Sequence, residues 1–208
     1  MNENQSTSKH IRIKARTFVE SKLESPIIRL LVFLRLTPNT LTMLGLIIAC
    51  LSAYFPSIGL FLASGLIMIA SGAFDLLDGT LARATNRTTQ VGALLDSLTD
   101  RISELIVLLG IMLFYLNVAN SAIEIVFVYT SAAGSIMVSY LRARSESLGI
   151  ECQVGIMTRP ERVLLLGGGL LLGQWISEIL LVVLLALTIF GLFTTVQRLM
   201  HSSKLLER

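Results

Sequence analysis

The stretch DLLDGTLARATNRTTQVGALLDSLTD, from Asp75 to Asp100, lies between two long apolar runs and holds every aspartate of the 208-residue chain. Asp75 and Asp78 are three residues apart at the end of the first run, and Asp96 and Asp100 are four apart at the start of the second. Each spacing puts both members of a pair on one helical face. The polar segment at residues 84–89 would let the two helices run antiparallel, so we expect the two pairs to converge.

The composition around this stretch is typical of an integral membrane protein. Hydrophobic residues make up 53% of the chain and charged residues only 15%, with a mean hydropathy of +0.74, whereas a soluble domain carries about 25% charged residues. Cys50 and Cys152 show no metal-site or redox spacing, so they are interpreted as packing residues. We expect an all-α integral membrane protein with no nucleic-acid partner.

Hydropathy predicts six membrane-spanning helices, each short of or close to the roughly 20 apolar residues that a bilayer requires. The expected spans are residues 40–55 (ending at Pro56), 58–74 with a continuation into the aspartate segment, 94–118, 123–141, 163–175 and 179–199. Pro38 is expected to begin the first of them.

The placement of Lys and Arg supports the count of six. These residues occur before the first span, after the sixth and in two alternate connections, whereas the connections near residues 56–57, 117–120 and 174–177 carry none. This alternation puts both termini in the cytoplasm by the positive-inside rule. The aspartate pairs and the predicted active site then face the cytoplasmic side of the cell membrane.

Three segments are expected along the chain: a basic segment at 1–36, a six-helix domain at 37–200 and a cytoplasmic tail at 201–208. Within the first, residues 11–19 place apolar side chains on one side and Lys and Arg on the others. This pattern favours an interfacial amphipathic helix on an anionic leaflet, although a solvated basic tail fits it as well. Gly169 and Gly173 form a small-residue face suited to packing within the chain or to dimerisation.

Four carboxylates near lipid repel one another and are costly to desolvate unless cations lie between them. Oxygen-rich clusters suit Mg²⁺ or Mn²⁺, and two such ions about 3.5–4 Å apart can clamp a phosphoryl group. Gly79 and Gly92 would allow close approach of a ligand, and Arg83 could offer its fork to a phosphate. The alternative, in which the aspartates only pair with neighbouring arginines, explains two spaced pairs at membrane depth less well.

The pattern Asp75-x-x-Asp78-Gly79-x-x-Ala82-Arg83, eight residues, Gly92-x-x-x-Asp96-x-x-x-Asp100 resembles the signature of the CDP-alcohol phosphotransferases at every position. The resemblance implies a homodimer that transfers a phosphatidyl group from a CDP-activated lipid such as CDP-diacylglycerol to an alcohol, releasing CMP. It implies that Asp75, Asp78 and Asp96 hold one ion and that Asp75, Asp96 and Asp100 hold or approach a second, with Asp100 as the general base. Gly79, Arg83 and Gly92, with Asn39, Thr40 and Thr89 as weaker candidates, would bind the CDP-lipid.

A second polar segment, SYLRARSESLGIECQVGIMTRPERV at residues 139–163, bears on the acceptor. Several arginines beside a metal site could bind an acceptor phosphate, and the candidates are Ser139, Arg142, Arg159 and Arg162. The segment resembles that of the phosphatidylinositol-phosphate and archaetidylinositol-phosphate synthases, except for Pro160, and the likeness implies inositol 1-phosphate. Glycerol 3-phosphate is the alternative acceptor, and a divalent-cation transporter is the alternative of another class.

Overall fold

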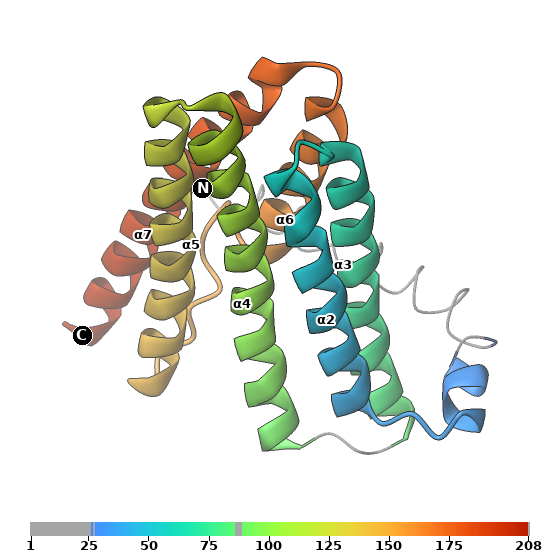
Figure 1. Cartoon of the computed structure of the whole chain (residues 1–208). Coiled ribbons are helices and arrows are strands. Elements are labelled where there is room, and N and C mark those ends of the chain that lie inside the picture. The colour runs from blue at the N-terminus through green and yellow to red at the C-terminus, as the bar shows by residue number, and fades with distance from the viewer. Residues whose placement is uncertain (1–25, 27, 86–88, 208) are drawn as a thin grey trace. The chain divides into compact units, whose positions relative to one another are not determined.

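The structure of the protein, a computed structural model, describes residues 26, 28–85 and 89–207 (Figure 1). Its elements are α2 (Pro38–Ser57), α3 (Phe61–Ala84), α4 (Gln90–Phe114), the π-helical turn η1 (Tyr115–Ala119), α5 (Ala122–Ser147), α6 (Arg159–Gly173) and α7 (Ser177–Leu206). These residues form no strand. The predicted all-α fold is confirmed.

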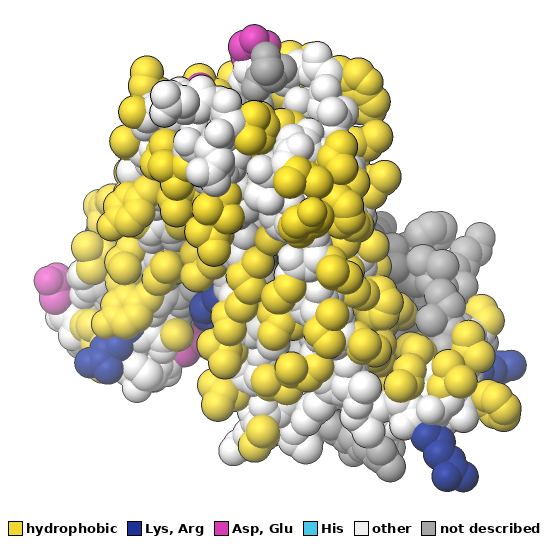
Figure 2. Space-filling model, in the orientation of Figure 1, with side chains coloured by type: hydrophobic (Ala, Val, Ile, Leu, Met, Phe, Trp, Pro, Cys, Tyr) yellow, Lys and Arg dark blue, Asp and Glu magenta, His cyan; other side chains and the backbone are white. Residues whose placement is uncertain are grey.

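In the part of the chain that the structure describes, five helices are long and apolar enough to cross a membrane: α2, α3, α4 with η1, α5 and α7. Large hydrophobic side chains are exposed along them, and Figure 2 shows a face on which such side chains predominate. The protein is therefore a multi-pass membrane protein. The predicted span at residues 163–175 falls on α6, which has only 15 residues, so the count of six is not confirmed.

The expected spans fall on the observed helices, but most of their ends differ by several residues. Helix α2 begins at Pro38 as predicted, but it continues past Pro56 to Ser57, because a proline in the last turn disturbs few helical hydrogen bonds. Gly59, in the left-handed region at φ +81°, then makes the turn before α3. The predicted interfacial helix at residues 11–19 lies outside the described residues.

The chain forms two compact units, and the expected segments at 1–36, 37–200 and 201–208 stay a prediction. The first unit runs to Gly45 and includes Ala73–Ser97. It therefore contains the start of α2, the end of α3 and the first two turns of α4. Its buried core is small and consists of Ile28, Leu41 and Leu81, with Leu31, Phe74 and Leu77 packed against them.

The second unit comprises Leu46–Gly72 and Leu98–Arg208 and contains the larger core. Helices α5 and α7 lie side by side in it (Figure 1), and the Ser131 hydroxyl on α5 donates to the Leu184 carbonyl on α7 at 2.9 Å. A Cβ added to Gly169 would lie 2.7 Å from a methyl of Val183. Gly169 therefore allows α6 to pack closely on α7, which explains this glycine without a dimer.

Candidate active site

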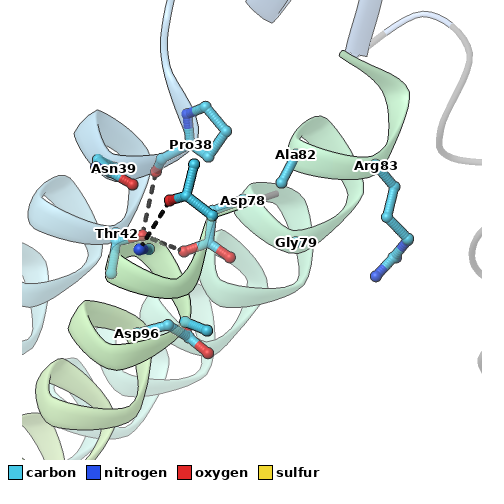
Figure 3. Close-up of a pocket in the computed structure, with 11 residues that line it drawn as sticks. Pro38, Asn39, Thr42, Asp78, Gly79, Ala82, Arg83 and Asp96 are labelled. Carbon is cyan, nitrogen blue, oxygen red and sulfur yellow. Dashed lines mark hydrogen bonds between the residues drawn. The ribbon is translucent and has the colours of Figure 1, made fainter. Parts of the chain in front are cut away.

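The first unit contains a pocket at the point where three helices end or begin (Figure 3). Helix α2 contributes its first turns, α3 its last turns and α4 its first two turns. The pocket is lined by Pro38, Asn39, Thr42, Asp78, Gly79, Ala82, Arg83, Thr89, Gly92, Ala93 and Asp96. Seven of these residues were predicted from the sequence as metal or CDP-lipid ligands: Asn39, Asp78, Gly79, Arg83, Thr89, Gly92 and Asp96.

Two threonines fix the helix starts that border the pocket. The Thr37 hydroxyl accepts a hydrogen bond from the Thr40 amide at 3.2 Å, and the Thr89 hydroxyl accepts one from the Gly92 amide at 3.0 Å. Both contacts cap helix N-termini, which otherwise leave amides unsatisfied. The predicted residue Thr89 therefore has a structural task at this site, whereas Thr40 is not among the residues that line the pocket.

Asp78 is held by a contact that the sequence did not indicate. Its Oδ2 accepts a hydrogen bond of 2.6 Å from the Thr42 hydroxyl, which also lies 3.1 Å from the Pro38 carbonyl oxygen (Figure 3). Asp78 is only 5% exposed and Thr42 only 4%. The buried hydroxyl thus sets the orientation of the Asp78 carboxylate toward the pocket.

The acidic side chains of the pocket fit a hard divalent cation by their donor chemistry. The carboxylates of Asp75 and Asp96 lie within electrostatic range of Asp78, and Asp78 and Asp96 both line the pocket. Such oxygen donors are those that Mg²⁺ and Mn²⁺ prefer. Among the described residues, however, no group of three or more His, Cys, Asp or Glu side chains is arranged to hold an ion, so the ligand sets remain predictions.

The two glycines of the pocket differ in the space around them. A Cβ at Gly79 would meet only the Arg83 Nη1 at 3.6 Å, an ordinary contact. A Cβ at Gly92 would lie 3.0 Å from the Thr89 Oγ1 and 3.3 Å from the Asn39 Oδ1. Gly92 is thus needed for the pocket itself, while Gly79 leaves open a surface that a ligand can approach. The Arg83 guanidinium donates to the Thr80 hydroxyl at 3.2 Å, beside this surface.

Asp100, the predicted general base, belongs to the second unit, on the next turn of α4 after Asp96. There its Oδ1 lies 2.6 Å from Nη2 of Arg159, one of the predicted acceptor residues. The side chains of Asp100 and Arg159 are 16% and 32% exposed. The structure therefore brings the predicted base and a predicted phosphate-binding residue into direct contact at a partly accessible position.

The other predicted acceptor residues occupy different environments within the second unit. Ser139 is half-buried on α5, and Arg142 is exposed and pairs with Glu146 at 2.8 Å. Arg162 is buried, and its Nε and Nη2 donate to the two carboxylate oxygens of Glu104 at 2.8 and 3.0 Å. The proposed role of these residues toward an acceptor is not tested by these contacts.

Arg198 is a further buried cation that sequence reasoning missed. It donates to the Val138 carbonyl at 2.5 Å and to the Val154 carbonyl at 2.9 Å, and it lies within electrostatic range of Arg142 and Arg162. The sequence feature that could have identified Arg198 is its position inside a long apolar helix, where a charged residue often marks a functional site in membrane proteins. Arg142 and Arg162, each paired with a glutamate, thus lie near the guanidinium of Arg198.

Comparison with known proteins links this arrangement to one chemistry. The sequence model of the CDP-alcohol phosphatidyltransferases matches residues 35–191. An archaetidylinositol phosphate synthase of Methanothermobacter thermautotrophicus is 36% identical over 170 residues, which cover 80% of this chain and 83% of that protein. A phosphatidylinositol phosphate synthase of Cutibacterium acnes is 32% identical over 190 residues, covering 86% and 91% of the two chains.

Solved structures agree with the sequence relatives. The crystal structure of Mycobacterium tuberculosis phosphatidylinositol phosphate synthase with CDP-DAG bound matches with a TM-score of 0.81 at 28% identity, covering 85% of this chain and 92% of that one. A second structure of that enzyme, in complex with manganese and citrate, also matches with a TM-score of 0.81, at 29% identity, covering 86% and 87%.

Proposed function

Because the chain belongs to the CDP-alcohol phosphatidyltransferase family, we propose that it transfers the phosphatidyl group of CDP-diacylglycerol to a hydroxyl of inositol 1-phosphate and releases CMP. The observation that carries the donor half of this proposal is the pocket of the first unit. It brings together Asp78, Gly79, Arg83, Gly92 and Asp96, five residues of the family signature that lie up to 18 positions apart in the sequence.

The donor would enter this pocket through its cytidine diphosphate. Gly79 offers an open backbone surface, and Arg83 lies beside it with a fork suited to phosphate oxygens. Asn39 adds an amide at the rim of the pocket, and Gly92 and Thr89 hold the start of α4 in place. Together these groups would fix the diphosphate beside the carboxylates.

Asp75, Asp78, Asp96 and Asp100 would hold two divalent ions, Mg²⁺ or Mn²⁺. When bound, such ions supply positive charge that stabilises the diphosphate as CMP leaves. The chain's own contribution is to orient the carboxylates, as the Thr42 hydroxyl does for Asp78. The manganese in the Mycobacterium tuberculosis relative supports this assignment.

Asp100 would act as the general base. It takes the proton of the acceptor hydroxyl while that oxygen forms a bond to the phosphorus that carries the diacylglycerol. The bond between this phosphorus and the bridging oxygen breaks, and CMP departs with the electron pair. The partial exposure of Asp100 and its contact with Arg159 are consistent with a group that exchanges a protein partner for a substrate.

The acceptor is proposed to carry a phosphate because cations gather where it would bind. Arg159 contacts the proposed base directly, and Arg142 and Arg162 both lie within electrostatic range of Arg198 in the same unit. The names of the relatives favour an inositol phosphate over glycerol 3-phosphate.

We also propose a homodimer in the cytoplasmic membrane. Both termini and the active site would lie on the cytoplasmic side, as the Lys and Arg pattern predicts.

The test is CMP release by the purified protein with CDP-diacylglycerol, Mn²⁺ or Mg²⁺ and either inositol 1-phosphate or glycerol 3-phosphate. We expect CMP with inositol 1-phosphate and little with glycerol 3-phosphate. The reverse preference would reassign the acceptor and keep the reaction. No CMP with any alcohol, together with Mn²⁺ flux in liposomes, would favour a cation transporter instead.

A further inference from the structure

Glu104 is a buried acid for which neither the signature nor the reaction provides a role. It lies on α4 one turn after Asp100, and its side chain is 4% exposed. Both of its carboxylate oxygens accept hydrogen bonds from Arg162 on α6, Oε1 from Nε at 2.8 Å and Oε2 from Nη2 at 3.0 Å. This two-point contact fixes the plane of the guanidinium as well as its position.

The third nitrogen of the Arg162 guanidinium also has a partner in the chain. Its Nη1 donates to the Met157 carbonyl at 3.3 Å, so three of the five N–H groups of the guanidinium have known partners in the chain. The contacts with Glu104 and Met157 hold the side chain from two directions. A cation held in this way presents its other N–H groups at one place, which is what recognition of an anion requires.

The pair is the inner of two ion pairs that join α4 to α6. Asp100 and Glu104 are four residues apart on α4, and Arg159 and Arg162 are three apart on α6, so each pair of neighbours shares a helical face. The outer pair, Arg159 with Asp100, is partly exposed, while the inner pair is almost inaccessible. The outer pair contains the proposed base, and the inner pair lies one helical turn farther along α4.

We propose that Glu104 is a positioning residue for the acceptor site, acting through Arg162. This inference rests on the proposed function, since it takes Arg162 and Arg159 to bind the acceptor phosphate. Glu104 carries a negative charge and cannot attract a phosphate itself. Its effect on the acceptor must therefore pass through the guanidinium that it holds and through the register of α4 on α6.

The test is a double-mutant cycle with Glu104→Gln, Arg162→Gln and the two together, using the phosphorylated acceptor that the wild-type protein turns over. We expect Glu104→Gln to raise the acceptor KM about 10- to 100-fold, the range that corresponds to loss of a hydrogen bond to a charged group. The KM for CDP-diacylglycerol should change less than about twofold, because the donor pocket is built from other residues. The double variant should be no worse than Arg162→Gln alone, since Glu104 then has no guanidinium to hold.

Two controls keep the outcome interpretable. Glu124→Gln makes the same change on α5, where the carboxylate accepts a hydrogen bond from Ser121, and should leave both KM values unchanged. Glu104→Asp keeps the charge but withdraws the carboxylate by one methylene. It should retain the thermal unfolding midpoint in detergent better than Glu104→Gln while still raising the acceptor KM.

Several results would overturn the assignment. Glu104→Gln with an unchanged acceptor KM, or with acceptor and donor KM raised equally, would leave only a role in stability. Additive losses in the double variant would show that Glu104 acts without Arg162. Failure of the proposed function is seen separately, in a wild-type protein that releases no CMP; direct binding of inositol 1-phosphate by calorimetry would then still compare Glu104→Gln with wild type.

Discussion

Removal of the Thr42 hydroxyl tests whether this buried group orients the Asp78 carboxylate for metal binding. Thr42→Val keeps the shape of the side chain and deletes the 2.6 Å hydrogen bond to the Asp78 Oδ2. Both residues are buried, so water cannot easily replace the lost donor. We expect the Asp78 carboxylate to lose its fixed orientation and the protein to bind Mn²⁺ more weakly.

The magnitude follows from the charge on the acceptor. A hydrogen bond to a charged group contributes about 1.5–3 kcal/mol, and about 1.4 kcal/mol corresponds to a factor of ten. If the whole contribution is expressed in metal binding, the Mn²⁺ affinity should fall about 10- to 100-fold, which is also the usual effect of removing a partner of a metal ligand. The hydroxyl also lies 3.1 Å from the Pro38 carbonyl oxygen, so part of the effect will appear as lower stability.

Thr85→Val is the matched control for that second contact. The Thr85 hydroxyl donates to the Leu81 carbonyl four residues earlier at 2.7 Å, the same spacing as that of Thr42 and Pro38, and Thr85 is not among the residues that line the pocket. Mn²⁺ binding would be measured by electron paramagnetic resonance and by the Mn²⁺ dependence of CMP release. Equal Mn²⁺ affinities in Thr42→Val, Thr85→Val and wild type would refute the role assigned to Thr42, and Thr42→Ser should recover most of the affinity.

Three further predictions concern the groups around the reaction. Asp100→Asn should abolish turnover while retaining Mn²⁺ and donor binding better than Asp75→Asn; equal loss of donor binding in both would contradict the base assignment. Arg142→Ala should raise the acceptor KM far more than the donor KM, measured by steady-state CMP release, and an unchanged acceptor KM would remove Arg142 from the site. Gly92→Ala should weaken CDP-diacylglycerol binding and lower the unfolding midpoint, because its Cβ would lie 3.0 Å from the Thr89 Oγ1; Gly79→Ala should weaken donor binding with little change in the midpoint, and similar midpoints for the two variants would contradict this distinction.

The sequence was sufficient for the helices and for the signature residues because both depend on local patterns. Long apolar runs interrupted at Pro38, near Pro56 and at residues 84–89 predicted the positions of the helices, although most of their ends differ by several residues. The spacing of the aspartates placed Asp78 and Asp96 on helix faces, and the pocket contains both. The length of α6 was harder to predict, because hydropathy does not show that its apolar run forms a helix of only 15 residues.

The supporting residues could not be predicted, because each acts through a partner far away in the sequence. Thr42 contacts Asp78 across 36 positions, and Glu104 contacts Arg162 across 58. A threonine early in a helix and a glutamate on an apolar helix are common, and neither has a spacing that indicates its partner. Only the folded chain, which brings the start of α2 to the end of α3 and joins α4 to α6, reveals these contacts.

The ion pairs of Asp100 with Arg159 and of Glu104 with Arg162 differ in exposure, and we propose that they therefore differ in their role toward the acceptor. A buried pair such as Glu104 with Arg162 is costly to desolvate, and an apolar pair of similar volume is often as stable, so stability alone does not account for it. The geometry of the pair accounts for it better. Two hydrogen bonds to Glu104 and a third to the Met157 carbonyl hold Arg162 in one orientation. The pair of Asp100 with Arg159 has the opposite property, because its partial exposure allows both partners to exchange each other for a substrate. In the proposed reaction, the phosphate of the acceptor would contact Arg159 and Arg162 while its hydroxyl proton would pass to Asp100, and Glu104 would keep Arg162 in place during that exchange.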